Sequence, residues 1–190
     1  PCASPVTYTG LAGGAGTTHW LDVYAIDTAG NADASAASYT WTIDTQAPNT
    51  TIDSGPLAVT SDTSATFTFS ANEGGSTFQC QLDGGGYSGC VSPATVTGLS
   101  GATHWVEIYA TDALGNADST PAFYGWLVDL TPPVSSLVSY PANPTNSTDA
   151  TIAFNANEPA TFQCQVDAGG YSSCTSPVTF TGLTGGAAAT

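Results

Sequence analysis

Apolar and polar residues alternate with a period of two along much of the chain, whereas the 3.6-residue period of a helix is absent. The clearest case is residues 64–71, SATFTFSA. There Phe67 and Phe69 share one strand face, and Thr66, Thr68 and Ser70 share the other. This alternation predicts strands with one face in a core and the other toward solvent.

The same alternation predicts further short strands in residues 47–129, separated by Gly, Pro and Asn turns. They cover residues 77–83, 87–90, 93–99, 104–112 and 122–129. Inward positions are expected at Phe78, Cys80, Leu82, Val106, Ile108, Ala110, Tyr124, Trp126 and Val128. About seven short strands in a segment of this length predict a β-sandwich.

Three segments of the sequence recur after a period of about 85 residues, which predicts tandem repeats. THWLDVYAIDTAGNAD (18–33) returns as THWVEIYATDALGNAD (103–118), SYTWTIDTQAP (38–48) as FYGWLVDLTPP (123–133), and ATFTFSANE (65–73) as ATIAFNANE (150–158). Residues 47–129 are then a complete repeat, residues 1–46 the C-terminal part of a repeat truncated at its start, and residues 130–190 the N-terminal part of a third, truncated at its end.

Residues 174–190 match residues 2–18 at 12 of 17 positions. We therefore expect the chain to be an excerpt from a longer array. The alternative is a short protein with two incomplete domains, whose strand edges would stay unpaired. Because the two outer segments would together supply one domain, copies are expected to fit head to tail along a filament, with lateral association as a further option.

The series FxCxLDGGxxxxCxSPxTxTGL…H…V.A.DxxGNxD…YxWxVDxTAP resembles the bacterial immunoglobulin-like repeats of large surface proteins, and the resemblance covers the whole chain. It implies an all-β fold of tandem Ig-like or fibronectin-III-like sandwiches, each of about seven strands. It also implies an exported structural or adhesive protein at the cell surface. The chain departs from the usual pattern in having no basic residues, and in having Trp and Tyr at usually polar positions of HWVEIYATD.

The cysteines lie at the edges of Gly-rich turns. Cys80 with Cys90, and Cys164 with Cys174, can each bridge one hairpin. Cys2 corresponds to Cys90 and Cys174, so its partner is expected outside the chain. A metal site is disfavoured because no CxxC spacing occurs and the histidines are distant in sequence. Disulfides indicate an oxidising, extracellular location.

The charge of the chain narrows its partners. It has 15 Asp and Glu, no Lys or Arg, and a net charge of −15. Binding to nucleic acid and to anionic membrane surfaces is therefore disfavoured, because both need basic side chains. No apolar run of about 18 residues is present, so no membrane insertion is expected in this segment.

The sequence gives little support for an enzyme. His19 and His104 fall on the strand faces of inward residues, where a ring hydrogen-bonded to backbone is favoured over a ligand or catalytic role. No Ser-His-Asp order, HExxH, P-loop or paired-carboxylate cleft appears, and no basic residue is present to bind an anionic substrate. We expect no catalytic activity.

Two acidic turns, DTAGNAD (27–33) and DALGNAD (112–118), offer oxygen ligands of the kind that Ca²⁺ binds. A lone hairpin supplies fewer than the required six to eight or so oxygens, and Asp and Asn also favour such turns for conformational reasons alone. No other cofactor is expected. The candidate ligands are Asp27, Asn31, Asp33, Asp112, Asn116 and Asp118, with Asp44 and Asp129 as additional ones.

Four aromatic residues, Trp20, Tyr24, Trp105 and Tyr109, are expected to point away from the core. They form a candidate contact surface for neighbouring chains or for glycans, unless loops or the next domain cover them. Two sequons, at Asn49 and Asn146, are candidate glycosylation sites at a frequency that chance also explains. The expected function is a structural component of an extracellular fibre, filament or cell-surface stalk. The alternative is an adhesin or glycan-binding surface module that uses the outward Trp and Tyr.

Overall fold

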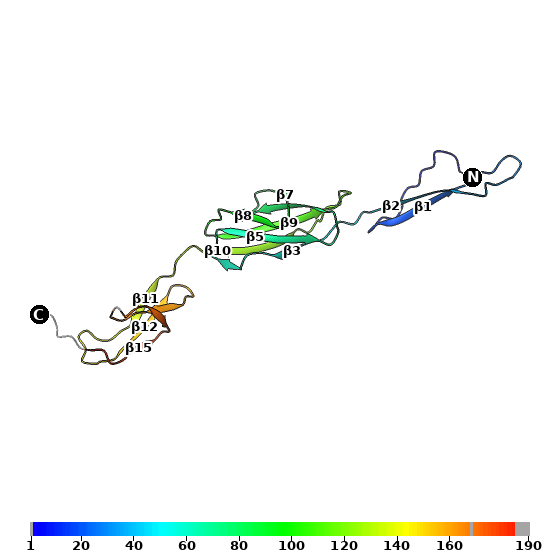
Figure 1. The fold of residues 1–190 in the computed structure, drawn as a ribbon. Helices are drawn as coiled ribbons and strands as arrows, with labels where there is room; N and C mark the ends of the chain where they lie inside the picture. The colour runs from blue at the N-terminus through cyan, green and yellow to red at the C-terminus, as the bar shows by residue number, and fades with distance from the viewer. Residues whose placement is uncertain (1, 168, 185–190) are drawn as a thin grey trace. The chain divides into compact units, whose positions relative to one another are not determined.

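The computed structural model describes residues 2–167 and 169–184, and every regular element in this part of the chain is a β-strand (Figure 1). The described residues therefore include no helix able to cross a membrane. The chain divides into two compact units, Pro1–Leu130 and Thr131–Thr190.

Residues 50–128 hold two sheets, which we call together the central domain. One sheet has the order β3-β5-β8 and the other has the order β4-β10-β9-β6-β7. All neighbours are antiparallel except β4 and β10, which are parallel. The strands are β3 (Thr50–Ser54), β4 (Val59–Thr60), β5 (Ser64–Ala71), β6 (Thr77–Leu82), β7 (Ser88–Cys90), β8 (Ala94–Thr97), β9 (Thr103–Thr111) and β10 (Ala122–Val128).

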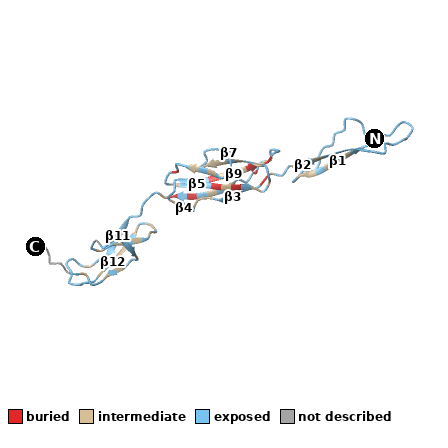
Figure 2. Ribbon diagram, viewed as in Figure 1, coloured by how far each residue is buried: buried red, intermediate tan, exposed pale blue. Residues whose placement is uncertain are grey.

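The buried core of the chain lies between these two sheets, as the red segments in Figure 2 show. Phe67 from β5 packs against Trp126 from β10, with their ring centroids 5.2 Å apart. Ile108 from β9 is fully buried. The inward positions alternate with outward ones along β5 and β9, as the sequence pattern predicts. The all-β arrangement with facing sheets is consistent with a β-sandwich.

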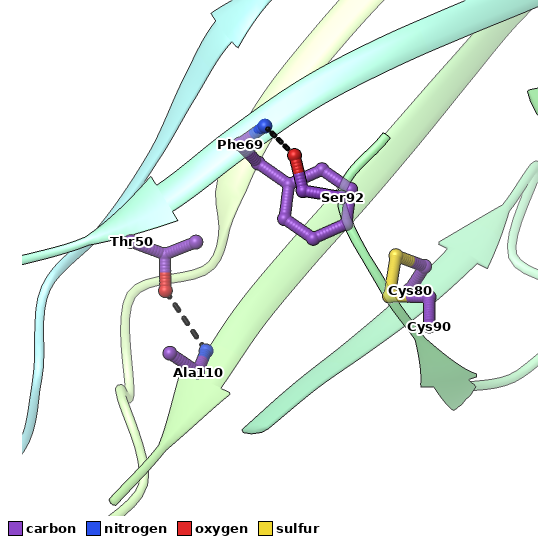
Figure 3. The surroundings of a disulfide bond; sticks show 6 residues. All are labelled: Thr50, Phe69, Cys80, Cys90, Ser92 and Ala110. Carbon is purple, nitrogen blue, oxygen red and sulfur yellow. Dashed lines mark hydrogen bonds between the residues drawn. A yellow bond between two sulfur atoms is a disulfide. The ribbon is translucent and has the colours of Figure 1, made fainter. Parts of the chain in front are cut away.

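Side-chain hydroxyls join the two sheets near the Cys80–Cys90 disulfide (Figure 3). The Thr50 hydroxyl accepts a hydrogen bond from the backbone N–H of Ala110 at 2.8 Å, which ties β3 to β9. The Ser92 hydroxyl accepts one from the N–H of Phe69 at 2.9 Å. Each bond satisfies a backbone donor in the interior, where an unpaired donor is costly.

In the first unit, β1 (Thr17–Val23) and β2 (Ala37–Ile43) form a separate antiparallel hairpin. His19 of β1 pairs with Trp41 of β2, and at the equivalent positions of the next repeat His104 of β9 pairs with Trp126 of β10. The described residues of this hairpin are exposed or half-buried, in contrast to their counterparts in the central domain.

The second unit repeats the pairings of β3 and β5 through β8. The pair Ser135↔Ala156 is the equivalent of Thr50↔Ala71 one repeat earlier, and the hairpin β13–β14 is the equivalent of β6–β7. One sheet has the order β11-β12-β15, and β13 pairs with β14. Their bounds are β11 (Ser135–Ser139), β12 (Ala150–Ala156), β13 (Phe162–Cys164), β14 (Ser172–Cys174) and β15 (Val178–Phe180).

Candidate functional site

Two disulfides close the hairpins β6–β7 and β13–β14. Cys80 is bonded to Cys90 and Cys164 to Cys174, each across a separation of 10 residues. These are the two pairs that the sequence pattern singles out. Cys2 is exposed and unbonded within the described residues, so the expectation of a partner outside the chain stays a prediction. Two such bonds indicate an oxidising environment.

Three carboxylates from distant parts of the sequence meet in what we call the acidic triad. Asp44 follows β2, Glu73 lies between β5 and β6, and Asp112 lies directly after β9. Each offers an oxygen, and these oxygens lie within 4.8 Å of one another. Oxygen donors of this kind suit Ca²⁺, although water and backbone carbonyls would have to supply the remaining ligands.

The acidic triad concentrates negative charge on Glu73. Partial burial raises the pKa of Glu73, and repulsion from Asp44 and Asp112 raises it further. Burial also acts to raise the pKa of Asp112. For Asp112, however, hydrogen bonds from the Asn116 side chain and from three backbone N–H groups outweigh burial, so its pKa lies below the ordinary 3.8. Asp112 therefore stays ionised, and Glu73 bears the cost of the like charges.

Asn116, another predicted calcium ligand, positions this triad. Its Nδ2 donates to Asp112 Oδ2 at 2.8 Å and to the carbonyl of Asp44 at 3.4 Å. Its backbone N–H donates to Asp112 Oδ1 at 2.8 Å. The side chain thus presents its donor group to the triad and links the segment after β2 to the turn after β9.

Asp118, also a predicted calcium ligand, lies outside the triad and fastens β3 to the turn after β9. Its Oδ2 accepts from the N–H of Thr50 at 2.8 Å, and its Oδ1 accepts from the N–H and the hydroxyl of Thr120, both at 2.8 Å. Burial raises the pKa of Asp118, but these hydrogen bonds lower it more, and the result lies below 3.8. Because its oxygens are already engaged by donors, the buried carboxylate has a structural role.

The first acidic turn has the same local hydrogen bonds as the second. Asp27 Oδ1 accepts from the N–H groups of Ala29 and Asn31, and Asn31 Nδ2 donates to Asp27 Oδ2, all at 2.8 Å. Asp33 Oδ1 accepts from the N–H of Ser35 at 2.9 Å. In the part of the chain that the structure describes, these residues and Asp129 belong to no group of three close ligands.

Glu73 is the member of the triad that the sequence reasoning missed. A signal for it was present, because each triad position has an acidic counterpart at the equivalent place in a neighbouring repeat. Glu73 in ANE returns as Glu158, and the other two positions have the counterparts Asp129 and Asp27. Their proximity could not be predicted, since it depends on how three loops meet in space.

His104 lies buried at the start of β9, between a carboxylate and a backbone carbonyl. Its Nδ1 is 2.7 Å from Asp83 Oδ2, and its Nε2 is 3.0 Å from the carbonyl oxygen of Ser100. Asp83 Oδ1 also accepts from the N–H of Trp105 at 2.9 Å. The hydrogen bond to Asp83, followed by that to Ser100, raises the pKa of His104 above 6.5 despite its burial.

Asp83 is a second residue that the sequence reasoning missed. It has a left-handed backbone conformation (φ 50°), which is uncommon for a residue other than glycine. In the first unit, His19 makes a bond of the same kind as His104 makes to Ser100: its Nε2 lies 2.8 Å from the carbonyl oxygen of Ala12. Both rings are therefore held by backbone, as expected for strand-start histidines.

The four predicted contact aromatics lie on outward faces to different degrees. Trp20 is 72% exposed, Tyr24 59% and Trp105 37%. Tyr109 is half-buried because the ring of Tyr87 packs edge-on against it, with the centroids 4.8 Å apart. The outer faces of β1 and β9 thus carry exposed aromatic side chains, the kind of surface that marks a contact.

Both sequon asparagines, Asn49 and Asn146, are exposed. Their side chains are therefore accessible to modification in a secreted protein. No protein-family model matches the chain, and no curated protein sequence matches it either.

Proposed function

We propose that this chain is a structural component of an extracellular fibre, filament or cell-surface stalk, built from tandem Ig-like repeats and without enzymatic activity. The observation that carries the proposal is the recurrence of strand pairing. The pair His19↔Trp41 recurs as His104↔Trp126, and after the same interval along the chain Thr50↔Ala71 recurs as Ser135↔Ala156. A shared register at a fixed interval is what one domain repeated along a chain would produce.

The strand order supports the Ig-like assignment. In the central domain, β3-β5-β8 has the neighbours of Ig strands A-B-E, and β10-β9-β6 has those of G-F-C. On this reading residues 1–46, 47–129 and 130–190 belong to three successive repeats. Short linkers containing proline, DTQAP (44–48) and DLTPP (129–133), limit bending between them.

The surface chemistry supports an extracellular structural role. The two disulfides fit an oxidising compartment, and the absence of Lys and Arg leaves no trypsin-type cleavage site. The two histidines are held by backbone carbonyls, and one also by Asp83, so neither is arranged as a free general base.

Electron microscopy of the native material tests the proposal. We expect a beaded thread in which each bead is one Ig-like domain of about 85 residues. Monodisperse particles without an axial repeat would contradict it.

A second candidate function is an adhesive module that stacks glycans on its aromatics. The exposed indoles of Trp20 and Trp105 favour it. A Trp105→Ala variant that loses binding on a glycan array, beside an unchanged Tyr140→Ala control, would support this candidate. A native chain that binds no glycan would argue against it.

A further inference from the structure

The second unit presents an open apolar groove where the central domain has a closed core. The groove has a volume of about 300 Å³. Its lining includes Leu137, Ile152, Phe154, Phe162, Val178 and Phe180. In the central domain, Phe67 and Phe69 at the positions of Ile152 and Phe154 are only 1% and 4% exposed, in the core cluster that β9 and β10 complete.

One strand edge beside this groove has no partner among the described residues. In the central domain, β6 pairs with β7 on one side and with β9 on the other. Its counterpart β13 forms a two-stranded sheet with β14. A strand related to β9 would therefore extend the hydrogen bonding of β13 and cover the groove.

The β1–β2 hairpin has the side chains that such a strand needs. Leu21 and Val23 correspond to Val106 and Ile108, which are 3% and 0% exposed in the core. In the hairpin, Leu21 is half-buried and Val23 is 41% exposed. Trp41 of β2 likewise corresponds to the buried Trp126.

Asp167 supplies a specific recognition point at the edge of the groove. Its backbone has the left-handed conformation of Asp83, with φ 48° against 50°. Unlike Asp83, it is exposed, and it accepts no hydrogen bond from the residues that the structure describes. The counterparts of the Asp83 partners are His19 and Trp20. Because the chain has no Lys or Arg, its two histidines are its only side chains that can become cationic, and His19 facing Asp167 is a charge-complementary pair.

We propose that the β1–β2 hairpin of one copy docks on the groove of the second unit of another copy, with β1 antiparallel to β13 and with His19 and the Trp20 N–H bound to Asp167. The inference rests on the proposed function, since it names the surface by which neighbouring repeats join. The register follows from the central domain: Cys80↔Ile108 and Gln79↔Tyr109 become Cys164↔Val23 and Gln163↔Tyr24. Each copy has one hairpin and one groove, so this heterologous contact propagates head to tail.

Docking requires the hairpin to uncover its inner face. In the free chain, Val6, Tyr8 and Leu11 line a shallow groove together with residues of that face, including Leu21 and Trp41. They correspond to Ala94, Val96 and Leu99, whose place in the second unit is already taken by β15 and the residue Leu183. The incoming copy must therefore displace its residues 6–11, and a Tyr8→Ser variant should associate more tightly than the native chain.

Sedimentation velocity of the oxidised 190-residue chain at rising concentration tests the inference. The native chain should form a ladder of oligomers. Asp167→Ala, which removes the recognition point, and Val23→Glu, which places a charge in the docked core, should each weaken association by at least about tenfold. Asp62→Ala, at an exposed carboxylate in the first unit, should leave it unchanged.

Mixing the two weakened variants gives the sharpest readout. Asp167→Ala keeps an intact hairpin and Val23→Glu an intact groove, so an equimolar mixture should form dimers where each variant alone is monomeric. Circular dichroism of each variant checks that it is folded, and Asp167→Asn, which tolerates the left-handed conformation, serves if the Ala variant is not.

Cross-linking tests the register directly. In a Cys2→Ser background, Tyr24→Cys combined with Gln163→Cys should give interchain disulfides, and Tyr140→Cys with Gln163→Cys should not. A native chain that stays monomeric, or a mixture without dimers, would overturn the docking. Neither result would affect a covalent array of repeats, which the micrographs test separately.

Discussion

At the scale of single residues, buried carboxylates hold the central domain together through backbone donors. Asp118 accepts hydrogen bonds from Thr50 and Thr120 and joins β3 to the turn after β9. Replacing Asp118 by Ala leaves those buried donors without a partner, and we expect a loss of about 1–3 kcal/mol in the free energy of unfolding. Urea denaturation measures it. Asp33→Ala, at the exposed counterpart, is the matched control and should change stability by less than about 0.5 kcal/mol.

The pH dependence of stability follows from two groups of residues. The pKa of His104 is raised above 6.5, so its contribution is fully present below pH 6.5 and is lost as pH rises through the folded pKa. The pKa values of Asp112 and Asp118 are lowered below 3.8, so their contributions are present above pH 3.8 and are lost as pH falls through the folded values.

Stability should therefore be greatest between pH 3.8 and 6.5, as thermal unfolding in a series of buffers would measure. An Asp83→Asn variant should lose the fall above pH 6.5 because His104 no longer faces a carboxylate. An unchanged alkaline limb in this variant would contradict the assignment to His104.

The acidic triad yields a prediction of the opposite sign. Because Asp44 and Asp112 repel the Glu73 carboxylate, Glu73→Gln should raise the melting temperature at neutral pH in the presence of a chelator. Glu158→Gln is the control at the equivalent position of the second unit. A lower melting temperature in Glu73→Gln would show that the charge stabilises the turn. Calcium titration of the native chain and of Glu73→Gln tests the expectation that a cation binds here.

At the scale of elements, the disulfide hairpin is the most constrained part of the sheet. Cys80–Cys90 spans a separation of 10 residues, and its removal should cost about 2–3 kcal/mol by freeing the unfolded chain. The double variant Cys80→Ala with Cys90→Ala should show this loss in urea unfolding of the central domain. The equivalent change at Cys164 and Cys174 should leave that transition unaltered. Intact-mass analysis before and after reduction checks that both bonds are present in the native chain.

The long strands could be predicted from sequence because their alternation is strong. Phe67 and Phe69 in β5, and Val106 and Ile108 in β9, are buried where the period of two places them. The short strands could not be predicted in this way. In β3, Ile52 is the only large apolar residue, and β4 is two residues long, so neither has room for a pattern.

The sites were less predictable than the strands because they depend on contacts between distant segments. The two acidic turns were recognisable from the sequence, yet the spacing alone could not separate Asp112, which joins the triad, from Asp118, which binds backbone. Likewise, the role of Asp83 follows from its left-handed backbone and from the position of His104, which is distant in sequence but adjacent in the fold.

At the scale of the whole molecule, uncompensated negative charge opposes folding. The chain carries a net charge of −15 and has no Lys or Arg to offset its carboxylates. Sodium chloride should therefore raise the melting temperature, as the screening length falls from about 30 Å at about 0.01 M to about 10 Å at about 0.1 M. Differential scanning calorimetry over this range measures the effect. Potassium chloride should act equally, and a falling melting temperature would contradict the charge argument.

The parallel pairing of β4 with β10 has a mechanical consequence. The N–H of Leu127 donates to the carbonyl of Ala58, and that of Asp129 to the carbonyl of Thr60, at 2.9 and 2.8 Å. Tension applied to the two ends of the central domain pulls these parallel strands in opposite directions along their length. Both hydrogen bonds are then loaded in shear together, whereas an antiparallel hairpin pulled from its open end peels apart one bond at a time. Under stretching, the domain should resist as a unit until β4 and β10 part, and then yield abruptly.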